Sequence, residues 1–112
     1  MSKQESTADT ISAWFGQRLP EEWVARPSEI TVDREEITVV LALAGPEYDA
    51  EATEAARAEA VAGYLARWRA DTRARRIPIA REAGHRFERK VAWGVRGGEH
   101  RELFTHLAVP VM

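Results

Sequence analysis

Residues 29–44, EITVDREEITVVLALA, contain two short segments of alternating apolar and polar residues on either side of a polar turn. This pattern predicts a β-hairpin with strands over 29–33 and 36–44. A two-residue loop would place Val32 opposite Ile37. Because side chains alternate along a strand, one face of the hairpin is then apolar and needs a covering layer. That face carries Ile30, Val32, Ile37, Val39, Leu41 and Leu43.

A second hairpin is predicted near the C-terminal end, with strands over 88–96 and 100–109. A two-residue loop would set Trp93 opposite Glu102. We favour a three-residue loop over 96–98, which sets Val91 opposite Leu103 and gives Gly98 the left-handed conformation that such loops require. This register predicts which residues of the last strand share a face with Ala92 and Gly94. They are His100, Glu102, Phe104, His106 and Ala108.

A first helix is predicted from a cap at Ser6 or Thr7 to about Leu19, where Pro20 ends it. Its apolar residues recur at helical spacing and form a single core-facing stripe. The stripe consists of Ile11, Trp14, Phe15 and Leu19. Trp23 follows in a connecting segment, and we expect it to plug the core.

A second helix is predicted to open at Gly45-Pro46 and to continue towards Phe87. Its expected apolar stripe includes Ala58, Val61, Leu65 and Trp68. Pro78 should kink or break this helix. Arg76 falls within the apolar stripe, which we interpret as a break in helical phase.

These elements predict an α+β fold with the order α-β-β-α-β-β, built as two layers of antiparallel hairpins with helices on one face. The 112 residues are enough for one domain, 1–112, whose residues 1–6 form a disordered tail. The apolar stop AVPVM suggests the N-terminal domain of a longer protein. No cysteine and no apolar run of about 18 residues is present, so thiolate chemistry and a membrane span are excluded and we expect a cytoplasmic protein.

The back of the predicted sheet is small and apolar, and no further predicted element covers it. We therefore expect a homodimer formed through this face. The candidate interface residues are Val40, Ala42, Ala44, Ala92, Gly94, Phe104 and Ala108.

Charge is unevenly spread along the chain, although the net charge is only −2. Residues 1–64 carry 5 basic and 13 acidic residues, whereas residues 65–96 carry 10 basic and 3 acidic ones. Such a basic segment can bind a phosphate backbone, but its arginines wrap around the helix axis instead of forming one stripe. The candidates for contact with nucleic acid are Arg67, Arg69, Arg73, Arg75, Arg76 and Arg81.

The chain shows no catalytic constellation and no cofactor motif. His100, Glu102 and His106 share a predicted strand face and are possible metal ligands by residue type. However, six residues of extended strand separate the two imidazoles by about 20 Å, which one ion cannot bridge. We therefore expect no metal, no cofactor and no catalytic residue.

The segments ISAWFGQRLPEEW, ITVDREEITVV and the run from RRIPIAREAGHRFERK to AVPVM resemble a family of small, uncharacterised actinobacterial proteins. In that family an equivalent region is followed by a segment similar to a ribbon-helix-helix DNA-binding or antitoxin-like unit. Pro78 departs from the family pattern, in which the helix continues without proline. The resemblance implies no catalytic residues, and the ribbon-helix-helix segment is absent from these 112 residues.

Three hypotheses of function follow. The first is a non-catalytic dimerising or interaction module of a cytoplasmic regulatory protein of a DNA-associated or antitoxin-like kind. The second is a small nucleic-acid-binding protein that uses the arginine segment 67–81. The third is a small-molecule binder or enzyme that uses the sheet face with His100 and His106.

Overall fold

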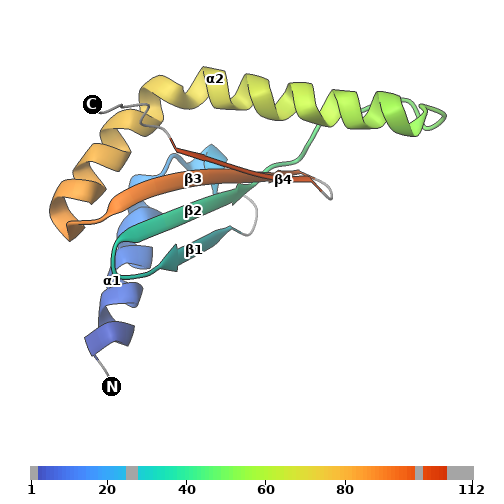
Figure 1. Cartoon of the computed structure of the whole chain (residues 1–112). Coiled ribbons are helices and arrows are strands. Elements are labelled where there is room, and N and C mark those ends of the chain that lie inside the picture. Colours follow the sequence, from blue (N-terminus) through green and yellow to red (C-terminus); the bar gives the residue numbers. More distant parts are fainter. Residues whose placement is uncertain (1–2, 25–27, 98–99, 106–112) are drawn as a thin grey trace.

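The computed structural model describes residues 3–24, 28–97 and 100–105, and it has an α+β fold with one four-stranded sheet and two helices (Figure 1). The predicted fold class, α+β, is therefore confirmed. In chain order the elements are α1 (Lys3–Arg18), the 3₁₀ helix η1 (Glu21–Trp23), β1 (Glu29–Val32), β2 (Glu36–Ala42), α2 (Glu54–Phe87), β3 (Lys90–Gly97) and β4 (His100–Thr105).

The strands lie in the order β1-β2-β3-β4, so each hairpin supplies two neighbouring strands. Both hairpins are antiparallel, whereas β2 and β3 pair in parallel at the centre of the sheet. A parallel pair needs a long crossover, and α2 supplies it (Figure 1). In the first hairpin Val32 pairs with Ile37 and Ile30 with Val39, so the predicted register is confirmed.

The second hairpin has neither of the registers considered from the sequence. Gly97 pairs with His100, which leaves two residues between the strands, and Trp93 pairs with Phe104. The favoured three-residue loop and the pairing of Val91 with Leu103 are therefore wrong. Because a change of register by an odd number of residues turns a strand over, Leu103 now shares a face with Gly94.

One hydrophobic core joins both helices to one face of the sheet. The strands contribute odd-numbered residues such as Ile37, Leu41 and Trp93, while α1 contributes Ile11 and Phe15, all buried. The predicted stripe of α1 is thus confirmed. Trp23 is also buried, as the prediction of a core plug requires, and it contacts two further indoles, those of Trp68 and Trp93.

The second helix differs from its prediction at its start. It begins at Glu54, not at Pro46, because the Thr53 side chain accepts a hydrogen bond from the Ala56 amide and caps the first turn. The following turns extend beyond the sheet (Figure 1), and Ala58, expected in the core stripe, is exposed. Leu65 is the first residue of α2 that is buried.

Pro78 lies inside α2 without ending it, since helical structure continues to Phe87. Figure 1 shows that the axis of α2 turns in its second half, where its colour passes from yellow to orange. A proline removes one backbone hydrogen bond and pushes the preceding turn aside, which accounts for a bend without a break. The expected break in helical phase at Arg76 is wrong, because Arg76 is itself buried on the core side of α2.

Candidate functional site

The face of the sheet that points away from the core carries part of the predicted interface. Val40 pairs with Gly94, Ala92 pairs with Thr38, and Leu103 lies next to Gly94 on β4. A Cβ atom placed on Gly94 would come within 2.5 Å of a Leu103 methyl carbon and 3.3 Å of a Val40 methyl carbon. Glycine therefore lets the leucine side chain lie flat across β3. We call Thr38, Val40, Ala92, Gly94 and Leu103 the open face.

The other four predicted interface residues have different positions. Phe104 pairs with Trp93, which is not the register that the prediction requires. Ala42 pairs with Arg96 and so has the strand parity of Val40, and with Ala44 it also lines a groove at the end of β2. Ala108 lies outside the described residues.

Charged side chains lie on the same side of the sheet as the open face. Glu29 on β1 lies 3.8 Å from Arg96 on β3 and 3.6 Å from Arg101 on β4, measured between carboxylate oxygen and guanidinium nitrogen. Arg96 and Arg101 are themselves Cα partners. Each of these side chains is about half exposed, so the ion pairs contribute little stability in the isolated domain. Because Glu29 on β1 pairs with Arg101 on β4, these side chains reach over the two central strands on the same face as Val40 and Gly94.

The six candidate arginines are not presented to a common surface. Arg76 is 1% exposed, and its guanidinium lies over the rings of Trp68 and Trp93 at 5.7 and 5.8 Å. It donates to the Thr72 hydroxyl at 3.0 Å and to the Arg69 carbonyl at 2.7 Å. Arg76 is therefore a core residue and cannot contact nucleic acid in this fold.

Burial, the largest cause, and the positive charges of Arg69 and Arg73 together lower the pKa of Arg76 to about 10. The group still carries its charge at neutral pH. Of the other candidates, Arg75 pairs with Glu22 and Arg67 lies 3.9 Å from Asp71, while Arg69, Arg73 and Arg81 are exposed.

A concave site lies where β2 ends, between η1 and α2. It has a volume of roughly 510 Å³, which is within the range of small-molecule sites. The indoles of Trp23 and Trp68 meet in it with ring centroids 5.5 Å apart. We call this site the aromatic groove; its lining residues are Glu22, Trp23, Ala42, Leu43, Ala44, Tyr64, Trp68, Asp71, Thr72 and Arg75.

Sequence reasoning missed the aromatic groove, although its α2 wall has a regular spacing. Tyr64, Trp68, Asp71, Thr72 and Arg75 recur at intervals of three and four residues, which places them on one side of a helix. An aromatic stripe with polar residues interspersed was a usable signal. The partner wall, η1, comes from a segment with no periodicity, so its position depends on tertiary packing.

The groove holds an ordered ion pair. Arg75 donates to a Glu22 carboxylate oxygen at 3.1 Å and its guanidinium lies 5.3 Å from the centroid of the Trp23 ring. The hydrogen bond from Arg75 lowers the pKa of Glu22 below its usual value. A planar cation, stacked on an indole and paired with a carboxylate, is therefore already accommodated at this site.

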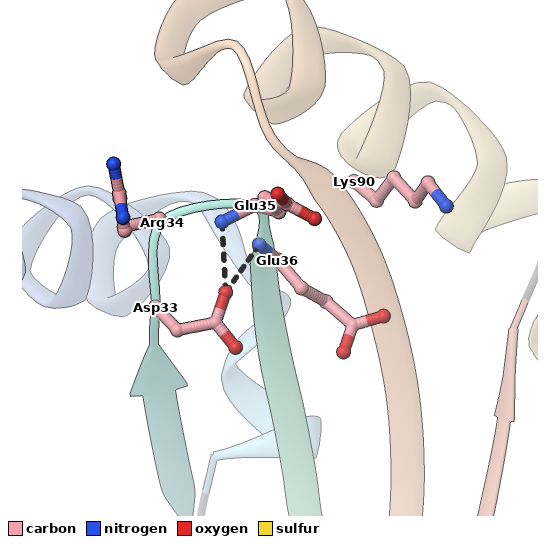
Figure 2. Close-up of a pocket in the computed structure, with 5 residues that line it drawn as sticks. All are labelled: Asp33, Arg34, Glu35, Glu36 and Lys90. Carbon is pink, nitrogen blue, oxygen red and sulfur yellow. Dashed lines mark hydrogen bonds between the residues drawn. The ribbon is translucent and has the colours of Figure 1, made fainter.

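A second hollow, of roughly 440 Å³, surrounds the turn between β1 and β2 (Figure 2). Its lining residues are Asp33, Arg34, Glu35, Glu36 and Lys90. One carboxylate oxygen of Asp33 accepts hydrogen bonds from the amides of Glu35 and Glu36 at 2.8 and 2.7 Å. Asp33 therefore holds the turn and fixes the register of the hairpin.

The third hypothesis from the sequence relied on His100 and His106. His106 lies outside the described residues, and Glu102 on β4 is exposed. Within the described part of the chain, no three His, Cys, Asp or Glu side chains lie close enough to hold a metal ion. The same residues include no helix that is both long and apolar enough to cross a membrane.

Comparison with known proteins identifies relatives for nearly the whole chain. The family described as Rv1265-like protein, N-terminal domain, matches residues 9–103. The chain is 49% identical over 109 residues to "Uncharacterized protein Rv1265" of Mycobacterium tuberculosis and to "Uncharacterized protein Mb1296" of Mycobacterium bovis. These alignments cover 97% of this chain and 46% of each relative, so the chain spans about half their length. No solved structure matches the chain.

Proposed function

The chain belongs to the family of Rv1265-like N-terminal domains, and we propose that it is a non-catalytic interaction domain that self-associates through the open face of its sheet. The observation that carries the proposal is Leu103. Its side chain is 59% exposed, and it lies across Gly94 beside Ala92 on the side of the sheet that the core does not use.

The architecture supports this choice of surface. Both helices contribute to the core on one face, and Leu103 is exposed on the other. In Figure 1 no labelled helix lies in front of the sheet. We therefore propose a two-layer domain whose second sheet face is covered by another copy, since sheets with small residues can pack face to face at close range.

A two-fold interface through this face would also include its charged side chains. The carboxylate of Glu29 and the guanidinium groups of Arg96 and Arg101 lie on the same side of the sheet, where charges steer association more than they add affinity. An interface of standard size buries about 800 Å² per partner, roughly a tenth of the 7630 Å² surface of the described chain.

Self-association would suit a regulatory role. If the other half of the relatives contains the ribbon-helix-helix-like segment implied by the sequence resemblance, dimerisation would place two such segments for paired DNA half-sites. Direct contact of this domain with nucleic acid is less well supported, because Arg76 is buried and Arg75 is engaged with Glu22.

Light scattering after size exclusion, at micromolar protein, tests the proposal. The wild-type chain should have about twice its mass of 12.6 kDa. Leu103→Glu should be monomeric, with a dissociation constant raised about a hundredfold, because a dimer would bury an unpaired carboxylate. The exposed position of Leu103 means that the monomer itself should fold normally.

Tyr48→Glu is the matched control, since Tyr48 is the other large hydrophobic residue that is exposed in the described chain, 48% against 59%, and it lies outside the open face. It should remain dimeric. A wild-type monomer at high concentration, or equal dissociation by both variants, would refute self-association through this face. Salt-sensitive binding of mixed-sequence DNA by the Leu103→Glu monomer would instead favour the arginine segment as the functional surface.

A further inference from the structure

The aromatic groove lies at a position where chains with parallel strands commonly bind ligands. Strands β2 and β3 are parallel, and the pairing extends past Ala42 because the Leu43 amide donates to the Arg96 carbonyl at 2.8 Å. Residues 42–44 leave the sheet here, and α2 crosses the same end on its way to β3. Ligands bind outside the carboxyl ends of parallel strands because the connecting segments part there and leave a crevice.

The walls of the groove are aromatic and its floor is small. Trp68 and Tyr64 are each half-buried, so part of each residue remains accessible, whereas Trp23 is 3% exposed and packs against Trp68. Ala42, Leu43 and Ala44 complete the lining on the side of β2. Accessible rings beside an unfilled volume provide a stacking surface for a flat ligand.

The charges of the lining select the sign of that ligand. Glu22 and Asp71 are acidic, and Arg75 is the basic residue of the lining. Since Arg75 already pairs with Glu22, Asp71 supplies the charge that a ligand would meet. Asp71 lies 3.9 Å from Arg67, but both side chains are well exposed, so this pair is weak and exchangeable.

The protein itself shows how a planar cation fits here. The Arg75 guanidinium stacks at 5.3 Å from the Trp23 centroid, and the guanidinium of Arg76 lies 5.7 Å from the Trp68 centroid. A guanidinium group therefore already lies over each of the two indoles. An incoming planar cation would find a third such surface at Tyr64 and Trp68, with Asp71 as its carboxylate.

We propose that the aromatic groove binds a small planar organic cation with N–H donors, of the amidinium, guanidinium or protonated aminoheterocycle class. The flat group stacks on Trp68 and Tyr64, and its N–H groups donate to the carboxylate of Asp71. This site is separate from the open face, so it is independent of the proposed self-association.

Three probes of equal shape and different charge test the proposal: benzamidine, benzamide and benzoate. The readout is the set of four indole N–H signals in a proton–nitrogen NMR spectrum of the whole chain, assigned by single Trp→Phe variants. Benzamidine should shift the signals of Trp68 and Trp23 saturably, benzamide more weakly, and benzoate not at all. The signal of Trp14 should not move, because its ring packs between Phe15 and Phe87, remote from the groove.

Asp71→Asn should weaken benzamidine binding by a factor of about five and leave benzamide unchanged, since one exposed charge pair is worth up to about 1 kcal/mol. Glu82→Gln is the matched control, because Glu82 is an exposed α2 acid that pairs with Arg18 away from the groove. It should bind benzamidine as the wild type does. The Leu103→Glu variant should also bind normally, which separates this site from self-association.

Several outcomes would overturn the proposal. Equal shifts with all three probes would mean that the groove does not select charge, and equal binding by Asp71→Asn would remove Asp71 from the site. Shifts of Trp14 together with Trp68 would indicate non-specific binding. Shifts of Trp23 and Trp68 that follow dilution of the protein, and not addition of probe, would show that a second copy of the chain occupies the groove.

Discussion

Arg76 offers the clearest test of how this core is held together. It is a charged residue, 1% exposed, between the rings of Trp68 and Trp93, and the described structure gives it hydrogen bonds to a hydroxyl and a carbonyl. We compare Arg76→Met, which keeps most of the volume and removes the charge, with Arg76→Ala, which removes both. The comparison separates packing from electrostatics.

The opposing contributions can be estimated from the structure. The lowering of the pKa of Arg76 from its ordinary value to about 10 means that folding disfavours its charged form by about 3 kcal/mol. The two buried cation–π contacts of Arg76 each stabilise the folded state by about 1–2 kcal/mol. These terms nearly cancel, so the free energy of unfolding of Arg76→Met should lie within about 1 kcal/mol of the wild type. Arg76→Ala should lose about 3 kcal/mol, because a large buried side chain is replaced by a cavity.

Neither substitution leaves the Thr72 hydroxyl or the Arg69 carbonyl without a hydrogen-bond partner. The Thr72 hydroxyl keeps its own donation to the Trp68 carbonyl at 2.8 Å, and the Arg69 carbonyl lies within the continuous helix α2. Urea unfolding followed by tryptophan fluorescence and circular dichroism measures the three free energies.

The pH dependence provides a second measurement on the same proteins. Above pH 10 the folded wild type releases the Arg76 proton while the unfolded chain, with its ordinary pKa, retains it. The unfolded state then binds more protons, so the stability of the wild type should rise relative to Arg76→Met, by about 1 kcal/mol near pH 11. If Arg76→Met is as unstable as Arg76→Ala, or if the difference falls with pH, the charged guanidinium stabilises the core and the reasoning fails.

Three further substitutions test the local structure. Gly94→Ala should cost about 1–3 kcal/mol in urea unfolding, because its Cβ would lie 2.5 Å from a Leu103 carbon and 3.0 Å from the Glu102 carbonyl oxygen; no loss would mean that β3 and β4 separate easily. Gly63→Ala should instead stabilise by about 0.5–1 kcal/mol, since nothing lies within 4 Å of its Cβ and the residue is inside α2; a loss would show that this turn is not helical in solution. Thr53→Ala should cost about 1 kcal/mol by removing the cap, with Thr53→Ser as the tolerated control, and equal losses would contradict the capping role.

The first hairpin was predictable because two independent signals agree. The alternation of apolar residues defines its core face, and Asp33 closes a turn whose length allows few registers. In the second hairpin the segment 96–98 contains two adjacent glycines, and glycine accepts most turn conformations. Sequence alone therefore left the turn position open. The resulting error placed Leu103 opposite Val91 on the core face and concealed it as an exposed residue.

The aromatic groove was not predictable in the same way, because its walls are far apart in the chain. Its η1 wall reaches α2 through the contact of Trp23 with Trp68 and through the ion pair of Glu22 with Arg75, 53 residues apart. Neither contact has a local signature. Only the α2 wall shows a sequence pattern, from Tyr64 to Arg75. That pattern predicts a groove only when the position of the opposite wall is also known.

The position of Arg76 led to the wrong prediction of a break in α2. The burial of Arg76 also shows how this helix packs against the core. An arginine and a proline two residues apart in an apolar stripe suggested a break. However, Leu65, Thr72, Arg76, Ile79 and Ala83 are all buried and stay in one helical phase, which a broken helix could not maintain. The proline bends the axis without shifting that phase, so one helix can cross the end of β2 and still pack along the core. The bend therefore allows a single element to supply both a wall of the aromatic groove and the cover of the sheet.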